Sequence, residues 1–153
     1  KKINIFTVQH ETIYKTAFKI FKDNIIIGIG PKNFRKVCEK EQYKTFTEQD
    51  RSIDGCQAHP HNTYLQLLTE TGVIGFLVLF FLFLYINYMF LRHKYLDIIK
   101  NIVLYSDYQI FLLIALYISL WPLAPTGNFF HNWLNIIYFM PIGFLLNSYY
   151  LKK

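Results

Sequence analysis

Three long runs of uncharged, mostly apolar residues occupy the second half of the chain. They cover residues 73–91, 108–125 and 129–151, and each approaches the ~20 residues that a helix needs to cross a bilayer core. A buried helix of a soluble protein is also continuously apolar, but three such runs leave too little polar surface to cover them. The pattern therefore predicts an all-α integral membrane protein with three transmembrane helices.

The first half of the chain is polar, and its clearest pattern lies between Glu11 and Asp23. Apolar residues recur there at helical spacing, while Lys15, Lys19 and Lys22 form a basic stripe. This predicts an amphipathic helix whose lysines either are solvated over a small core or meet lipid phosphates or a diphosphate ligand. We expect a mostly helical loop domain over residues 1–71 and a membrane domain over residues 72–153.

A glycine-rich segment follows this predicted helix. Residues 25–34 read Ile-Ile-Ile-Gly-Ile-Gly-Pro-Lys-Asn-Phe. A β-branched run broken by glycines and a proline predicts a short extended piece that enters a tight turn. A dinucleotide-binding loop is excluded because Asn33 replaces the third glycine and no βαβ unit follows.

Basic residues near the apolar runs predict the orientation in the membrane. The net charge is +6, and the short segments after the first and third runs carry the basic residues Arg92, Lys94, Lys100, Lys152 and Lys153. The loop at residues 126–128 carries none. Because positively charged short loops stay in the cytoplasm and the rule weakens beyond ~60 residues, we expect residues 1–71 to be extracytoplasmic.

The start of the chain does not explain how this loop domain is exported. Lys1 and Lys2 precede only scattered apolar residues, which fall short of the ~7–15-residue apolar core of a signal peptide. The chain also starts without Met. We therefore expect it to be the C-terminal part of a longer polytopic protein, whose upstream transmembrane helices accompany it.

Cys38 and Cys56 are the two cysteines of the sequence, and both fall in the segment placed outside the cytoplasm. In an oxidising compartment they can form a disulfide. Two buried free thiols are the alternative.

The sequence His59-Pro-His61-Asn62 lies shortly before the first apolar run. An imidazole titrates near neutral pH, so one of these histidines can act as a general base toward a hydroxyl group. A metal site is a second interpretation, but a third ligand at regular spacing is missing and His10 is distant in sequence. A structural pair of surface histidines is the third.

The motif His61-Asn62, nine residues, Gly72-Val-Ile-Gly75 resembles the signature of the bacterial O-antigen ligase and O-antigen polymerase family. Upstream, Gly28-Ile-Gly30 and the following Phe34 resemble the Gly-x-Gly-x-x-x-Phe element of that family, and residues 127–133 resemble the start of a late helix. Complete members have many more membrane spans, so the resemblance implies a C-terminal region.

The resemblance implies a metal-independent, inverting glycosyl transfer at the periplasmic side of the bacterial inner membrane, without a cofactor. The donor is a glycan on undecaprenyl diphosphate, and the acceptor is a lipid A-core sugar of lipopolysaccharide or a second lipid-linked glycan. In this reading His61 is the general base, and His59 and Asn62 support it. No nucleic-acid partner is expected.

A diphosphate leaving group needs cations, for which guanidinium groups are best suited. Many members of the family place an Arg ahead of the amphipathic helix, where this chain has Gln9-His10-Glu11. We therefore expect the diphosphate to be bound by a set of cations drawn from Arg35, Arg51, Lys32 and Lys15, with solvated surface charge as the alternative. Gly28, Gly30, Gly72 and Gly75 are expected to be structural, the last two by allowing close helix packing.

Two other classes of protein fit the same sequence. One is a non-enzymatic membrane protein, either truncated or a helper subunit, that binds lipid-linked glycan without turnover. The other is a histidine-dependent metal sensor or part of a transporter.

Overall fold

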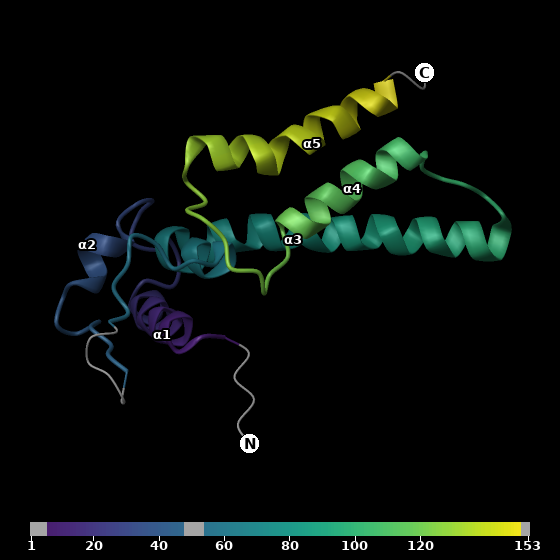
Figure 1. Ribbon diagram of the computed structural model, residues 1–153. Coiled ribbons are helices and arrows are strands. Elements are labelled where there is room, and N and C mark those ends of the chain that lie inside the picture. Colours follow the sequence, from purple (N-terminus) through teal and green to yellow (C-terminus); the bar gives the residue numbers. More distant parts are fainter. Residues whose placement is uncertain (1–5, 48–53, 151–153) are drawn as a thin grey trace. The chain divides into compact units, whose positions relative to one another are not determined.

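The computed structural model describes residues 6–47 and 54–150. In this part of the chain the regular elements are all helices: α1 (Val8–Asp23), α2 (Phe34–Cys38), α3 (Thr63–Lys100), α4 (Asp107–Ser119) and α5 (Asn132–Tyr150) (Figure 1). The all-α prediction is thus confirmed. The helices divide between two compact units, a first unit of Lys1–Val78 with Pro122–Phe130 and a second unit of Leu79–Trp121 with His131–Lys153.

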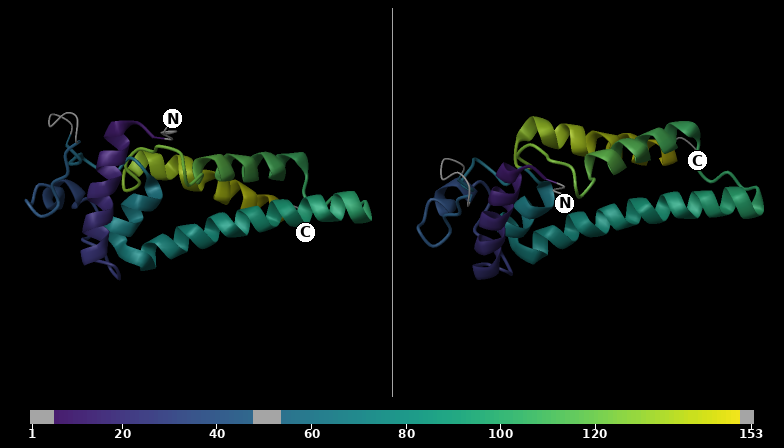
Figure 2. Two further views of the ribbon diagram at one scale, coloured as in Figure 1. Left: turned by 90° about the horizontal axis from the view of Figure 1, so that it is seen from below. Right: turned by 60° about the horizontal axis from the view of Figure 1, so that its bottom comes forward.

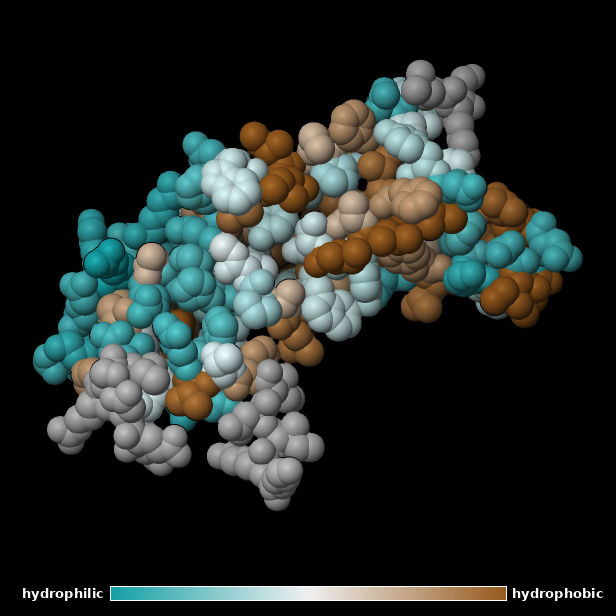
Figure 3. All heavy atoms as spheres, viewed as in Figure 1, coloured by the Kyte–Doolittle hydropathy of each residue, from teal (hydrophilic) through white to brown (hydrophobic). Residues whose placement is uncertain are grey.

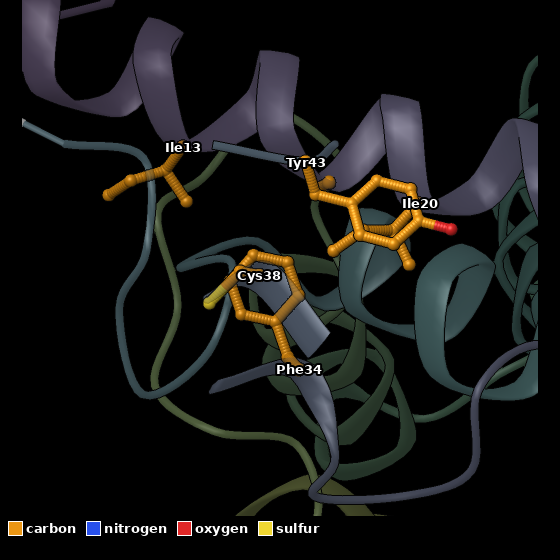
Figure 4. Packing of buried hydrophobic residues seen from close by; sticks show 6 residues of the cluster. Ile13, Ile20, Phe34, Cys38 and Tyr43 are labelled. Carbon is orange, nitrogen blue, oxygen red and sulfur yellow. The ribbon is translucent and has the colours of Figure 1, made fainter. Parts of the chain in front are cut away.

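Helix α1 builds the core of the first unit. Its buried face carries Ile13, Ala17 and Ile20, which pack against Phe34 of α2 and against Tyr43 (Figure 4). The predicted amphipathic helix is confirmed, and it begins before Glu11 because the side chain of Thr7 caps it by accepting a hydrogen bond from the backbone N–H of His10. The lysine stripe, Lys15, Lys19 and Lys22, is exposed on the other side.

A disulfide ties α2 to the loop before α3. Cys38 and Cys56 are joined with their Cα atoms 5.3 Å apart, and the side chain of Cys38 is fully buried in the core beside α1. The bond closes a loop with a sequence separation of 18. In the chain-entropy model, a loop of this size stabilises the fold by about 3 kcal/mol.

Removal of this disulfide should lower the free energy of unfolding by about 3 kcal/mol. The matched variant is Cys38→Ser combined with Cys56→Ser, compared with the parent protein by urea denaturation with and without reductant. Reductant should destabilise the parent and leave the double variant unchanged. Equal stability of parent and double variant would contradict a stabilising disulfide.

The glycine-rich segment is a series of turns rather than an extended piece. Residues 25–27 turn back directly after α1, and the backbone N–H of Gly28 donates to the carbonyl of Asn24 at 3.1 Å. Gly28, Gly30 and Lys32 all have positive φ, which an extended strand does not permit. The predicted tight turn is present, the predicted extended piece was wrong, and the short helix α2 was not foreseen.

These turns form hydrogen bonds to the backbone on both sides of a break in α3. At Gly72 the backbone leaves the helical conformation, with φ 67° and ψ −165°, and the helix axis bends there (Figure 2). The N–H of Val73 donates to the carbonyl of Ile25 at 2.8 Å, and the carbonyls of Thr69 and Glu70 accept from the N–H groups of Ile29 and Gly30 at 3.0 and 2.8 Å. Three backbone groups next to the break are therefore satisfied by the turns.

The second unit contains the rest of α3 together with α4 and α5. Helices α4 and α5 lie side by side (Figures 1 and 2), and the amide of Gln109 donates to the hydroxyl of Ser148 at 3.0 Å. The rings of Phe83 on α3 and Tyr117 on α4 stack with centroids 5.6 Å apart. On the face shown in Figure 3, apolar side chains are exposed over these helices, as expected for surfaces that meet lipid.

Among the described residues, α3 is the one helix long and apolar enough to cross a membrane. It extends beyond the predicted span 73–91, to Lys100. Helix α4 has 13 residues and ends at Ser119, shortly before Pro122. It is therefore shorter than the predicted span 108–125. At 1.5 Å per residue it measures ~20 Å, against a hydrocarbon core of ~30 Å.

Helix α5 covers most of the predicted span 129–151 and contains Pro141. The second and third transmembrane helices, the boundary between the loop and membrane domains and the orientation of the chain stay predictions.

Candidate functional site

Three histidine side chains meet in the first unit. The rings of His59 and His61 lie with centroids 4.1 Å apart, and the ring of His10 lies 6.0 Å from that of His61. His10 belongs to the first turn of α1, whereas the other two precede α3. The fold therefore brings next to His61 a histidine that is distant in the sequence.

The backbone at His61 is held in an unusual conformation. Its φ is 55°, in the left-handed region that residues other than Gly, Asn and Asp seldom adopt. Its carbonyl accepts a hydrogen bond from the N–H of Thr126 at 2.9 Å. A neighbouring contact joins the hydroxyl groups of Thr63 and Thr126 at 2.9 Å. The segment around Thr126 thus fixes the chain where it carries the histidine.

Asn62 links the same two segments and starts α3. Its side-chain carbonyl accepts from the N–H of Leu65 at 3.0 Å, as an N-cap residue does. Its side-chain amide donates to the carbonyl of Pro122 at 2.7 Å. Because the side chain of Asn62 is buried and both of its ends are bonded, it positions the histidine next to it.

The surroundings of the histidines favour the neutral imidazole. Partial burial, and secondly the neighbouring His10, hold the pKa of His61 below its ordinary value. Burial, and secondly the neighbouring His61, also lower the pKa of His59, although a backbone hydrogen bond with Thr126 opposes the shift. At neutral pH both rings are therefore largely uncharged, and a neutral ring nitrogen can accept a proton.

A buried chain of polar side chains continues from this site along α3. Gln66 and Glu70 are both completely buried, and the amide of Gln66 donates to a carboxyl oxygen of Glu70 at 3.0 Å and to the side-chain carbonyl of Asn128 at 2.8 Å. The side-chain carbonyl of Gln66 accepts from the N–H of Phe129 at 2.9 Å, and the other carboxyl oxygen of Glu70 accepts from the N–H of Phe34 at 3.1 Å. Through these hydrogen bonds, one face of α3 binds both the segment 122–130 and the start of α2.

The expected diphosphate ligands lie apart from the histidines. Lys15 is five residues after His10 on α1, so it points about 140° away around the helix. Lys15, Lys32 and Arg35 are exposed, and in the described part of the chain no hydrogen bond or ion pair joins them to the three histidines. Arg51 lies outside the described residues.

The residues that the structure describes contain no group of three or more His, Cys, Asp or Glu side chains arranged to hold a metal ion.

Residues 9–80, just under half of the chain, match the family described as O-antigen ligase. This segment is similar to the O-antigen ligase family. It contains the three histidines, the buried pair Gln66 and Glu70 and the start of the long apolar helix. The family resemblance of the His-Asn and glycine motifs is thus confirmed. Neither the curated proteins nor the solved structures yielded a match to the chain.

The sequence contained a signal for part of this candidate site that motif reading missed. Asn62, Gln66 and Glu70 recur at intervals of four, which places three hydrogen-bonding side chains on one helix face. Such a polar stripe indicates a buried partner. For His10 and Asn128 the sequence held no comparable signal, because their positions depend on how distant segments fold together.

Proposed function

We propose that the chain is the catalytic end of a membrane glycosyltransferase of the O-antigen ligase or polymerase type. The donor is an undecaprenyl-diphosphate-linked glycan, and the acceptor is a hydroxyl group of a lipid A-core sugar or of a second lipid-linked glycan. The observation that carries the proposal is a half-buried His61 that is fixed by a backbone hydrogen bond with Thr126, in a segment that matches the O-antigen ligase family.

His61 is the general base in this reaction. Its neutral ring nitrogen takes the proton of the acceptor hydroxyl as the oxygen attacks the anomeric carbon of the donor sugar. The new glycosidic bond forms while the bond from the anomeric carbon to the diphosphate oxygen breaks, so the configuration inverts. The electron pair leaves with undecaprenyl diphosphate, and the protonated imidazole later releases its proton to water.

The surrounding residues have supporting roles in this proposal. Asn62 fixes the histidine segment, and His59 packs against the ring of His61. Arg35, Arg51, Lys32 and Lys15 remain the candidates for the leaving diphosphate, assisted by transmembrane helices upstream of this chain. The site faces the periplasm, with the helices of the second unit in the inner membrane.

A transfer assay tests the proposal. The full-length protein is incubated with an undecaprenyl-diphosphate-linked glycan and with either acceptor, and products are separated on a gel. Formation of a glycosylated acceptor, in the presence of a metal chelator, supports an inverting transferase without a metal, provided the new linkage has the opposite anomeric configuration. Binding of the lipid-linked glycan without any product would favour the non-enzymatic alternative.

The transfer rate should stay high down to pH values below about 6.5, the ordinary pKa of histidine. The base works only when it is unprotonated, and because its pKa is lowered, its activity is lost only as the pH falls through that lowered value. The replacement His10→Gln removes a neighbouring charge. The loss of activity at low pH, which is the acid limb of the pH profile, should therefore move to higher pH. The measurement is the initial rate across the pH range for the parent and the variant.

The exposed His131 in the second unit offers a matched control, since His131→Gln should leave the limb in place. An acid limb that does not move in the His10→Gln variant would contradict the electrostatic coupling of the two histidines.

A further inference from the structure

Three consecutive isoleucines stand exposed in the turn after α1. The exposed fractions of Ile25, Ile26 and Ile27 are 51%, 68% and 74%. Isolated apolar residues on a surface are ordinary, but a contiguous group of large aliphatic side chains indicates a binding surface. We call residues 25–27 the isoleucine turn.

The isoleucine turn is fixed at the point where the uncharged run of α3 begins. The carbonyl of Ile25 accepts from the N–H of Val73, the first residue of that run, at 2.8 Å. The carbonyl oxygen of Ile26 lies so close to Gly72 that it leaves no room for a Cβ atom there. The turn is therefore level with the first turn of the apolar helix.

Large apolar side chains are also exposed on the first turns of that helix. Ile74 and Val78, both within the first unit, have exposed fractions of 58% and 71%. A bilayer that receives α3 at Val73 also reaches the isoleucine turn, since the backbones of the two segments are hydrogen-bonded at this level. This continuity identifies lipid as the partner of the exposed isoleucines.

Positive charges stand on both sides of the turn. Lys22, in the last turn of α1, lies three residues before Ile25, and Lys32 follows five residues after Ile27; both are exposed. The neighbouring carboxylate of Asp23 accepts a hydrogen bond from the hydroxyl of Tyr43 at 2.9 Å. Lysine side chains can hold their ammonium groups at lipid phosphates while their stems lie along apolar surface.

We propose that the isoleucine turn inserts into the membrane leaflet that α3 enters at Val73, with acyl chains around its side chains and lipid phosphates at Lys22 and Lys32. The inference goes beyond the proposed function and rests only on α3 being membrane-inserted. Gly30 and Ile29, which follow the turn, bond to Glu70 and Thr69 of α3. Insertion thereby sets the depth at which the first part of α3, and the histidines before it, stand above the bilayer.

Quenching by brominated lipid tests this insertion. The variant Ile27→Trp is made in the full-length protein with every native tryptophan, including Trp121 and Trp133, replaced by Phe. It is reconstituted into vesicles of dibrominated phosphatidylcholine with added phosphatidylglycerol. The indole at position 27 should show a blue-shifted emission and lose most of its fluorescence. The matched control is Gln42→Trp, at an exposed position of the same unit, which should lose little.

Two results would overturn the proposal. If the indole at position 27 were quenched as little as the indole at position 42, the turn would lie in water. A blue-shifted emission at position 27 without quenching would mean that a protein segment covers it. A second variant, Ile26→Glu in the Ile27→Trp background, should reduce the quenching at position 27, because a charge beside the indole opposes insertion into hydrocarbon. None of these measurements depends on glycosyl transfer.

Discussion

Replacing His61 with Asn should lower the rate of glycosyl transfer by ~10²–10⁴, the usual contribution of a general base. The amide of Asn cannot take up the proton of the acceptor hydroxyl, so the attacking oxygen stays protonated. Asn is the sharpest replacement because the φ of residue 61 is 55°, and Asn tolerates this left-handed conformation better than Ala does. The measurement is the initial rate with saturating donor.

The matched control is His131→Asn, which changes an exposed histidine of the second unit and should leave the rate unchanged. Thermal unfolding of the His61→Asn variant should follow that of the parent, so that the loss of rate is not a loss of fold. A fully active His61→Asn variant would refute the role of His61 as the base.

Replacing Gly72 with Ala should destabilise the first unit by more than ~1–3 kcal/mol, the usual cost of holding a residue other than Gly in a sparsely populated conformation. Gly72 has φ 67°, and an added Cβ atom would overlap the carbonyl group of Ile26. The loop would have to move, and with it the hydrogen bonds that satisfy the break in α3. Gly28→Ala should act similarly, because its Cβ atom would lie 2.5 Å from the carbonyl carbon of Glu70.

Gly143 provides the control for these two variants. An added Cβ atom there meets no other atom within 4 Å, and Ala is favoured over Gly inside a helix by about 1 kcal/mol. Gly143→Ala should therefore unfold at the same temperature as the parent or slightly above it, while Gly72→Ala and Gly28→Ala unfold well below it. Three equal melting temperatures would contradict the close contact between the turn at residues 25–30 and α3.

The sequence predicted those features that depend on local pattern. The spacing of apolar residues located α1, and the uncharged run located the membrane-compatible part of α3, because side-chain periodicity and run length follow directly from helix geometry. The break at Gly72 was not predictable in this way. Glycine permits a positive φ but does not require it, and only the turn at residues 25–30, packed against α3, decides that the helix opens there.

The same limit applies to the candidate site. The motif singled out His61 and Asn62, but the closeness of His10 to His61 depends on how α1 is packed. Two partners of Gln66, Asn128 and Phe129, come from a segment more than 60 positions away. The basic stripe of α1 identifies Lys15 as a cation, but the sequence does not show which side of α1 faces the histidines. Charge patterns identify cations without indicating their distance from a catalytic group.

The two bonds made by Asn62 restrict which residue can follow the histidine. Ser, Thr, Asp and Asn are all common helix caps, but this position needs an acceptor for Leu65 and, from the other end of the same side chain, a donor for Pro122. An ionised Asp offers only acceptors, and the hydroxyl of Ser or Thr has a single oxygen and a shorter reach. An amide of this length meets both demands. The identity of residue 62 is therefore set by the geometry of a loop that lies 60 residues further along the chain.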